Sequence, residues 1–197
     1  MKKINKKLYK ILLLSFLVFS FEVKSKILSI GTNESKVTIK VFSSLTCPAC
    51  ANFHSEIFYK LKKDFIDKGL VKFEHHPFPL DLAALNAEVI LRCDDDEKKK
   101  IELLGKIYEK QRLWAVGSDI DKINNSIKKI GAEVDLGIEM MNNCLKNEKS
   151  QDEILNQRIE AQKKYKIEAT PTIFVNEKKY TGEVNYNQFK KFLEKNL

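Results

Sequence analysis

VTIKVF at residues 37–42, followed by CPAC at residues 47–50, decides the fold of this chain. The first segment is dominated by β-branched and apolar residues, which favours a buried strand. The second segment places two thiols two residues apart, where a helical pattern begins near Ala51. A helix N-terminus carries a partial positive charge, which favours the thiolate of the first cysteine. Because the thiolate is the nucleophile of disulfide exchange, this stretch predicts redox chemistry.

Around this stretch, the pattern predicts strands toward both ends of the chain and helices between them. We expect strands over residues 27–30, 37–42, 70–75, 172–175 and 179–181. Helical spacing of apolar residues predicts helices over residues 50–69, 82–92, 101–108, 134–145, 153–165 and 186–193, and another after Asp119 or Asp121. Asp81 is the expected N-cap of the helix over 82–92. The order predicts one compact unit in which two strand-bearing segments flank a helical block.

Residues 1–25 have the pattern of a signal peptide. Five lysines within residues 2–10 precede an apolar run of eleven residues, Ile11 to Phe21. A spanning helix needs about 20 apolar residues, so the run matches the shorter core of a cleavable signal. We place cleavage after Ser25. An uncleaved membrane anchor is the alternative.

Export changes the meaning of both the charge and the cysteines. Residues 1–25 hold six lysines and one glutamate, so the net charge of +8 falls to +3 once they are removed. With no Arg-rich stripe interleaved with aromatics, the sequence gives no indication of nucleic-acid binding. Disulfides persist outside the cytosol, so four cysteines suggest two pairs. The remaining residues, 26–197, suffice for one well-cored domain.

Three segments carry a resemblance to a known family. They are the strand and Cys-Pro-x-Cys block at residues 37–50, Pro-Leu-Asp at 79–81, and Ala-Thr-Pro-Thr at 169–172 before Ile-Phe-Val-Asn. With them the chain resembles the thioredoxin superfamily, and specifically the DsbA-like family of exported bacterial thiol-disulfide oxidoreductases. The resemblance covers essentially the whole of residues 26–197. It implies an α/β thioredoxin fold with an inserted α-helical domain, divided as 26–80, 81–150 and 151–197.

The resemblance also implies roles for individual residues. Cys47 would be the exposed attacking thiol, Cys50 the resolving thiol and Pro171 a cis-proline facing them. Pro48 suits the first turn of a helix, because its missing N–H would be unpaired there anyway. We expect Pro48, Ala49 and Thr170 to contact substrate, the last through backbone groups that pair with an extended segment.

Cys93 and Cys144 resemble the second, non-catalytic pair that relatives often carry in the helical block. A bridge between them would close a loop of 52 residues and stabilise the fold by roughly 4 kcal/mol in the chain-entropy model. Two free thiols are the alternative.

The chain departs from the family in two places. Relatives commonly carry an acidic residue six positions before the first cysteine, buried beneath the disulfide, where it moves a proton. Val41 stands there, so water or another side chain must protonate the leaving thiolate. Many strongly oxidising relatives have a histidine between the cysteines, where this chain has Ala49. A less stabilised thiolate makes the disulfide a weaker oxidant, so we expect a potential less oxidising than roughly −120 mV.

A structural disulfide and half of a zinc site are the other interpretations of the Cys47–Cys50 pair. A closed zinc site needs four ligands, and only His54 lies close by in sequence, so no metal site is expected. We expect His54 to be a partly exposed surface or packing residue and not a proton shuttle. His75 and His76 end a predicted strand, where they point to opposite faces and cannot easily share an ion.

The sequence thus predicts an exported, periplasmic thiol-disulfide oxidoreductase that introduces disulfides into proteins and needs no cofactor. Its expected partners are reduced, unfolded or folding exported proteins and, by the resemblance, a DsbB-like membrane reoxidase. Only about ten residues lie between Lys26 and Lys36, too few for a dimerising module, so a monomer is expected. A disulfide isomerase or reductase using the same dithiol is the close alternative. A metal-binding or holdase protein is the alternative from another class.

Overall fold

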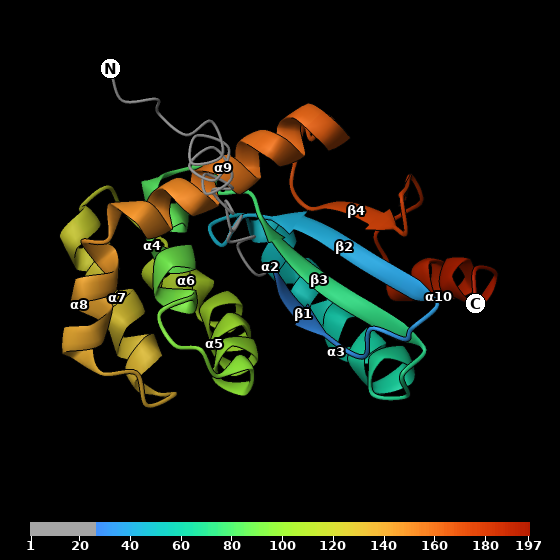
Figure 1. The fold of residues 1–197 in the computed structure, drawn as a ribbon, viewed down its shortest axis with the longest axis horizontal. Helices are drawn as coiled ribbons and strands as arrows, with labels where there is room; N and C mark the ends of the chain where they lie inside the picture. Colours follow the sequence, from blue (N-terminus) through green and yellow to red (C-terminus); the bar gives the residue numbers. More distant parts are fainter. Residues whose placement is uncertain (1–26) are drawn as a thin grey trace, which may run out of the picture.

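β2 (Val37–Ser43) lies at the centre of a five-stranded mixed sheet in the computed structural model, which describes residues 27–197 (Figure 1). The predicted signal peptide and its cleavage site lie outside the described residues. The strand order is β1-β3-β2-β4-β5, with β2 and β3 parallel and every other pair antiparallel. β3 (Val71–Pro77) and β4 (Thr172–Val175) flank β2, and β1 (Leu28–Ile30) and β5 (Lys178–Lys179) are the edge strands.

The helix that follows the cysteine pair covers one face of this sheet. It begins as α2 (Pro48–Phe53) and continues through η1 (His54–Phe58), α3 (Tyr59–Leu61) and η2 (Lys62–Ile66), where η marks π-helical turns. The predicted stop at Gly69 is confirmed, since Gly69 has φ +70°. Buried side chains of this helix pack with β2, β3 and β4 and with α10 (Tyr186–Glu194).

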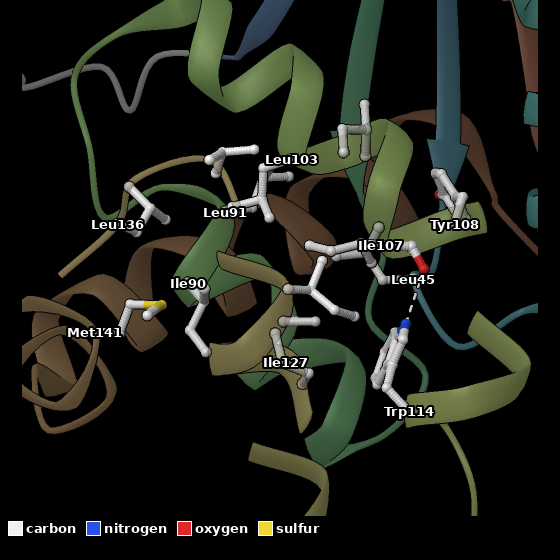
Figure 2. Close-up of a cluster of buried hydrophobic side chains, with 14 of the residues drawn as sticks. Leu45, Ile90, Leu91, Leu103, Ile107, Tyr108, Trp114, Ile127, Leu136 and Met141 are labelled. Carbon is white, nitrogen blue, oxygen red and sulfur yellow. Dashed lines mark hydrogen bonds between the residues drawn. The ribbon is translucent and has the colours of Figure 1, made fainter. Parts of the chain in front are cut away.

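The helical block between β3 and β4 forms a second core beside the sheet. It contains α4 (Leu82–Leu91), α5 (Glu97–Glu109), α6 (Gln111–Trp114), α7 (Ile120–Ala132) and α8 (Ile138–Leu145). Figure 2 shows their buried side chains meeting around Ile107 and Ile127, and Trp114 donates its indole N–H to the Ile107 carbonyl at 2.8 Å. Because Leu45, Cys47 and Cys50 belong to the same cluster, the block packs directly behind the cysteine pair.

α9 (Glu148–Tyr165) connects the block to the sheet. Its Ile154 packs with Leu85 and Val89 of α4, whereas Ala161 and Tyr165 pack with Phe42 on the second face of the sheet. The proposed division between residues 150 and 151 therefore falls inside this helix.

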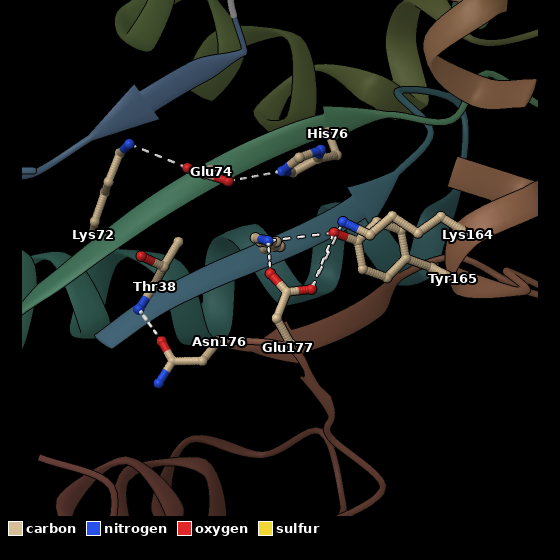
Figure 3. Close-up of polar contacts among 9 residues, drawn as sticks. Thr38, Lys72, Glu74, His76, Lys164, Tyr165, Asn176 and Glu177 are labelled. Carbon is tan, nitrogen blue, oxygen red and sulfur yellow. Dashed lines mark hydrogen bonds and ion pairs between the residues drawn. The ribbon is translucent and has the colours of Figure 1, made fainter. Parts of the chain in front are cut away.

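Polar contacts tie β2 to the C-terminal segment (Figure 3). Lys40 pairs with Glu177 and donates to the Tyr165 hydroxyl at 3.3 Å, while Asn176 accepts from the Thr38 N–H at 2.9 Å. These contacts support the register of β2 and β4 that places residue 170 beside the cysteines.

Two predicted helix caps are confirmed, since Asp81 caps α4 and Asp119 caps α7 through their side chains. Three helices begin elsewhere than predicted. The helix predicted over 101–108 begins at Glu97, because the Asp96 side chain caps α5. The predicted helix over 134–145 begins only at Ile138, because Asp135 adopts φ +60° and Gly137 is the N-cap.

The helix predicted over 153–165 begins at Glu148, because the Asn147 side chain accepts from the Ser150 N–H. No helix of residues 27–197 combines the length and the apolar character that crossing a membrane requires.

Candidate active site

The cysteine pair lies at the C-terminal end of β2, at the start of the helix. Cys47 is the N-cap of α2 in an extended conformation, and Pro48 is its first residue. β4 runs antiparallel to β2 with Phe42 opposite Thr172, so the residues before β4 reach the same edge of the sheet. The Thr170–Pro171 peptide bond, which is cis, therefore lies beside Cys47.

Cys47 and Cys50 are both thiols in this structure, and they differ in exposure. The side chain of Cys47 is 9% exposed and that of Cys50 is 1% exposed. The prediction that Cys47 is exposed is therefore wrong for the reduced protein. The Cys47 sulfur turns toward the 169–171 loop and lies 3.2 Å from the Thr170 carbonyl oxygen, to which it donates while it is protonated.

The surroundings shift the pKa values of the two thiols in opposite directions. The pKa of Cys47 falls to about 5, chiefly because the Cys50 thiol donates to its sulfur, with further lowering from Thr170 and the N–H groups of Cys50 and Ala49. Burial raises the pKa of Cys50, and the neighbouring Cys47 raises it further. One sulfur is therefore a thiolate at neutral pH while the other keeps its proton.

Two side chains from distant elements hold the loop that carries Cys47. Gln111 of α6 is buried and donates to the carbonyls of Leu45 at 2.8 Å and Cys47 at 3.0 Å. Asp81 accepts from the Thr46 hydroxyl at 2.8 Å while it caps α4. No sequence signal identified Gln111, because a glutamine in a helical pattern usually faces solvent.

The surface beside Pro48 is hollowed. A pocket of about 360 Å³ lies between the α2–η1 segment and helices α5 and α6, and its wall includes Ala51, Tyr59 and Arg112. Pro48, the residue after Cys47, lines one end of this pocket.

The three histidines of residues 27–197 have separate surroundings. His54 is 3% exposed and packs among Phe58, Tyr59 and Tyr108, so the expected partial exposure is wrong and the packing role is confirmed. His75 contacts Glu88 at 2.7 Å, whereas His76 contacts Glu74 at 2.9 Å. In the part of the chain that the structure describes, no group of three or more His, Cys, Asp or Glu side chains is placed to hold a metal ion.

A disulfide joins Cys93, just after α4, to Cys144 in α8. Their Cα atoms are 5.9 Å apart. The bridge lies within the helical block, where Cys93 packs against the buried cluster that also includes Cys47 and Cys50.

Comparison with known proteins assigns the family. The sequence profile of the family described as Thioredoxin matches residues 24–195. Disulfide bond formation protein D of Bacillus subtilis (strain 168) is 33% identical over 177 residues, which cover 85% of this chain and 76% of that protein. The chain belongs to the thioredoxin family. Within that superfamily it is a DsbA-like thiol-disulfide oxidoreductase, as the resemblance predicted.

Two further matches of this thioredoxin-family protein are informative. A putative protein-disulfide oxidoreductase of Rickettsia typhi is 27% identical over 157 residues, 80% of this chain, and the chain spans only 57% of that protein. The crystal structure of Wolbachia pipientis alpha-DsbA1 superposes with a TM-score of 0.80 at 24% identity, covering 87% of this chain and 90% of that one. The predicted α/β thioredoxin fold with a helical insertion is thereby confirmed.

Proposed function

We propose that the chain is exported to the periplasm, after removal of residues 1–25, and introduces disulfides into reduced, unfolded or folding proteins there. Cys47, Cys50 and Pro171 are its catalytic residues. Pro48, Ala49 and Thr170 contact the substrate, and the Cys93–Cys144 bridge is structural. The protein acts as a monomer without a cofactor.

The observation that carries the proposal is the split acidity of the cysteine pair. A pKa of about 5 makes Cys47 a good leaving thiolate and a nucleophile at neutral pH. A thiolate that is stable in the reduced protein favours reduction of its own disulfide, and therefore oxidation of the substrate. The neighbouring Thr170–Pro171 segment supports the substrate role, since Pro171 has no N–H and lies half-buried beside the sulfur.

In the proposed reaction, a substrate thiolate attacks Cys47 of the oxidised protein. A bond forms between the two sulfurs, the Cys47–Cys50 bond breaks, and its electron pair moves to Cys50. A second substrate thiolate then attacks the substrate sulfur of the mixed disulfide. The substrate leaves oxidised, and the enzyme keeps a Cys47 thiolate and a Cys50 thiol. A DsbB-like membrane protein would restore the disulfide.

A trapping experiment tests this proposal. In a Cys50→Ala variant the mixed disulfide at Cys47 cannot be resolved from within the protein, so reduced client proteins should accumulate as conjugates that dithiothreitol releases. The matched control is Cys47→Ala, which should trap none and should lose insulin-reduction activity. If wild type and Cys47→Ala catalyse insulin reduction equally, the enzymatic role of the pair is wrong.

A periplasmic isomerase or reductase is the second candidate, because the reduced protein already holds the Cys47 thiolate that such an enzyme needs. The equilibrium constant of the pair with glutathione separates the two. An oxidase requires a disulfide that glutathione reduces readily, whereas a reductase requires one that resists it.

A further inference from the structure

The sequence does not show which group gives a proton to Cys50 or takes one from it. When the disulfide opens, Cys50 receives an electron pair, and burial raises its pKa, so it must also receive a proton. On reoxidation the same thiol must lose that proton before it attacks. Val41, where relatives carry an acid, is apolar and 2% exposed. This inference rests on the redox chemistry proposed above and identifies the groups that move its proton.

A small interior cavity adjoins Cys50. Its volume is about 10 Å³, the least room in which one water molecule fits. Its polar lining comes from Ser43, Cys50, His54, His75 and Tyr108, all of them buried. A buried water needs two to four polar partners, and this wall supplies them.

Two of the lining side chains end in buried polar atoms without a hydrogen-bond partner. They are Nε2 of His54 and the hydroxyl of Tyr108. Burial lowers the pKa of His54 to about 3, so its imidazole is neutral and can accept or donate one hydrogen bond. Since leaving a buried donor or acceptor unsatisfied is unfavourable, both atoms favour a water between them.

A chain of hydrogen bonds leads away from the cavity on its other side. The Ser43 hydroxyl lies 3.2 Å from Nδ1 of His75, and Nε2 of His75 lies 2.7 Å from Oε1 of Glu88. Glu88 is fully buried, and its Oε2 lies 3.8 Å from Nε of Arg92. The His75–Glu88 contact joins a ring nitrogen to a carboxylate oxygen, which is the arrangement of an acid–base relay.

The geometry points to a water-mediated proton relay beneath Cys50: one water in the cavity, held by His54 and Tyr108, carries protons between the Cys50 sulfur and the buried His75–Glu88 pair. Glu88 and His75 are positioning residues in this scheme, because they reach the sulfur only through the water. They supply from α4 and β3 the function that Val41 cannot supply from β2.

The proton balance is complete without a further reactant. The substrate thiol releases its proton to solvent as it becomes the attacking thiolate. When the Cys47–Cys50 bond breaks, the water donates a proton to Cys50 and takes one from the His75–Glu88 pair. That pair regains a proton from solvent, so the net change moves one proton from substrate to Cys50. Reoxidation reverses each transfer.

Charged and titratable groups face the relay from every element around it. Cys47 approaches from α2, His54 from η1, and Tyr108 from α5, where it stands within electrostatic range of both cysteines and of Glu88. Arg92 of α4 sits between Glu88 and Glu153 of α9. His54 and Tyr108 line both the cavity and the open pocket beside Pro48, so these two side chains lie between the cavity and that pocket.

The test separates the two steps in which glutathione disulfide oxidises the reduced protein. In the first step the Cys47 thiolate attacks, and in the second Cys50 loses its proton and closes the disulfide. Glu88→Gln keeps an acceptor for His75 but cannot take a proton. We expect the second step to slow at least tenfold at pH 7 and to recover as the pH rises, while the first step and the Cys47 titration stay unchanged.

The chain offers a matched control for that change. Glu74→Gln alters the same kind of His–Glu pair one residue along β3, where Glu74 contacts His76 and does not line the cavity (Figure 3). Both steps should keep wild-type rates in this variant. Equal slowing by the two substitutions, or a normal second step in Glu88→Gln, overturns the relay. A missing first step in wild type would instead refute the proposed function.

If Glu88→Gln does not fold, Tyr108→Phe tests the relay instead. This variant removes only one hydroxyl, and the contact between Glu88 and Arg92 remains. The second step should slow severalfold in this variant, and an unchanged second step overturns the proposal. A high-resolution crystal structure of the reduced wild-type protein should show an ordered water within hydrogen-bond distance of Nε2 of His54 and the Tyr108 hydroxyl. Its absence would overturn the proposal as well.

Discussion

Gln111 donates a hydrogen bond from its side-chain amide to the backbone carbonyl of Cys47 at 3.0 Å. One residue lies in the helical insertion and the other begins the helix on the sheet, 64 positions apart. The same amide nitrogen also donates to Leu45. The insertion therefore holds the loop that presents the reactive sulfur, in addition to covering it.

Gln111→Leu should destabilise the reduced protein because it removes the donor from two buried carbonyls at nearly constant volume. Leaving such groups unsatisfied costs about 1–3 kcal/mol, and urea unfolding measures the loss. Gln188→Leu, at an exposed position of α10, is the control and should change stability by less than about 0.5 kcal/mol. Equal losses in the two variants would argue against a special role for Gln111.

The thiolate of Cys47 should titrate near pH 5 in the reduced protein, as followed by its ultraviolet absorbance. Cys50→Ala should raise that pKa, because the hydrogen bond from the Cys50 thiol is the largest cause of the lowering. Cys50→Ser keeps a donor at the same place and should titrate closer to wild type. A Cys47 pKa that is the same in Cys50→Ala and wild type would contradict this assignment.

The reduction potential should depend on pH with two slopes. Above pH 5 reduction takes up two electrons and one proton, because Cys47 stays a thiolate while Cys50 is protonated. The potential should then fall by about 30 mV per pH unit, and by about twice that below pH 5. Equilibration with glutathione at several pH values measures it, and a steeper slope at pH 7 would mean that Cys47 is protonated there.

At pH 7 that potential should be less oxidising than roughly −120 mV, because Ala49 supplies no cation beside the thiolate. Ala49 is exposed, so Ala49→His can be accommodated and should make the disulfide more oxidising. Ala49→Gln adds similar bulk without charge and should leave the potential close to wild type.

The stability of the reduced protein should also depend on pH through Cys47. Its pKa is depressed on folding from an ordinary value of about 8.5 to about 5. The resulting stabilisation is complete above pH 8.5 and is lost as the pH falls through 5. The melting temperature of reduced wild type should therefore drop by several degrees more than that of Cys47→Ala between pH 8 and pH 4.

Removing the second disulfide should cost stability without changing the active site. Cys93→Ser with Cys144→Ser opens a loop of 52 residues, worth roughly 4 kcal/mol in the chain-entropy model. For a chain of this size that corresponds to a fall of roughly 10 °C in melting temperature. The Cys47 titration should stay at wild-type values, because the groups that lower its pKa are Cys50, Thr170 and the N–H of Ala49 and not the bridge. A shifted titration would show that the bridge acts on the redox pair.

Local signals in the sequence identified most of the elements. The β-branched run at 37–42, the aspartate caps and the glycine stop at 69 each act within a few residues, so they can be read without tertiary information. Reliance on local signals also explains why a helix was wrongly predicted to begin at residue 134. Val134 and Leu136 are buried, but they enter the core from a turn, and buried apolar residues in a turn imitate helical spacing.

By itself, the sequence determined that two thiols stand at the start of a helix after a buried strand, because that outcome depends on neighbouring residues alone. Only the tertiary structure decided which groups surround them. Strand pairing brought Thr170 to Cys47, and helix packing brought Gln111 to the loop, Tyr108 to the cavity beside Cys50 and Glu88 to His75. Burial and contacts between residues far apart in the chain set the proton affinity of a thiol, and no local pattern in the sequence encodes them.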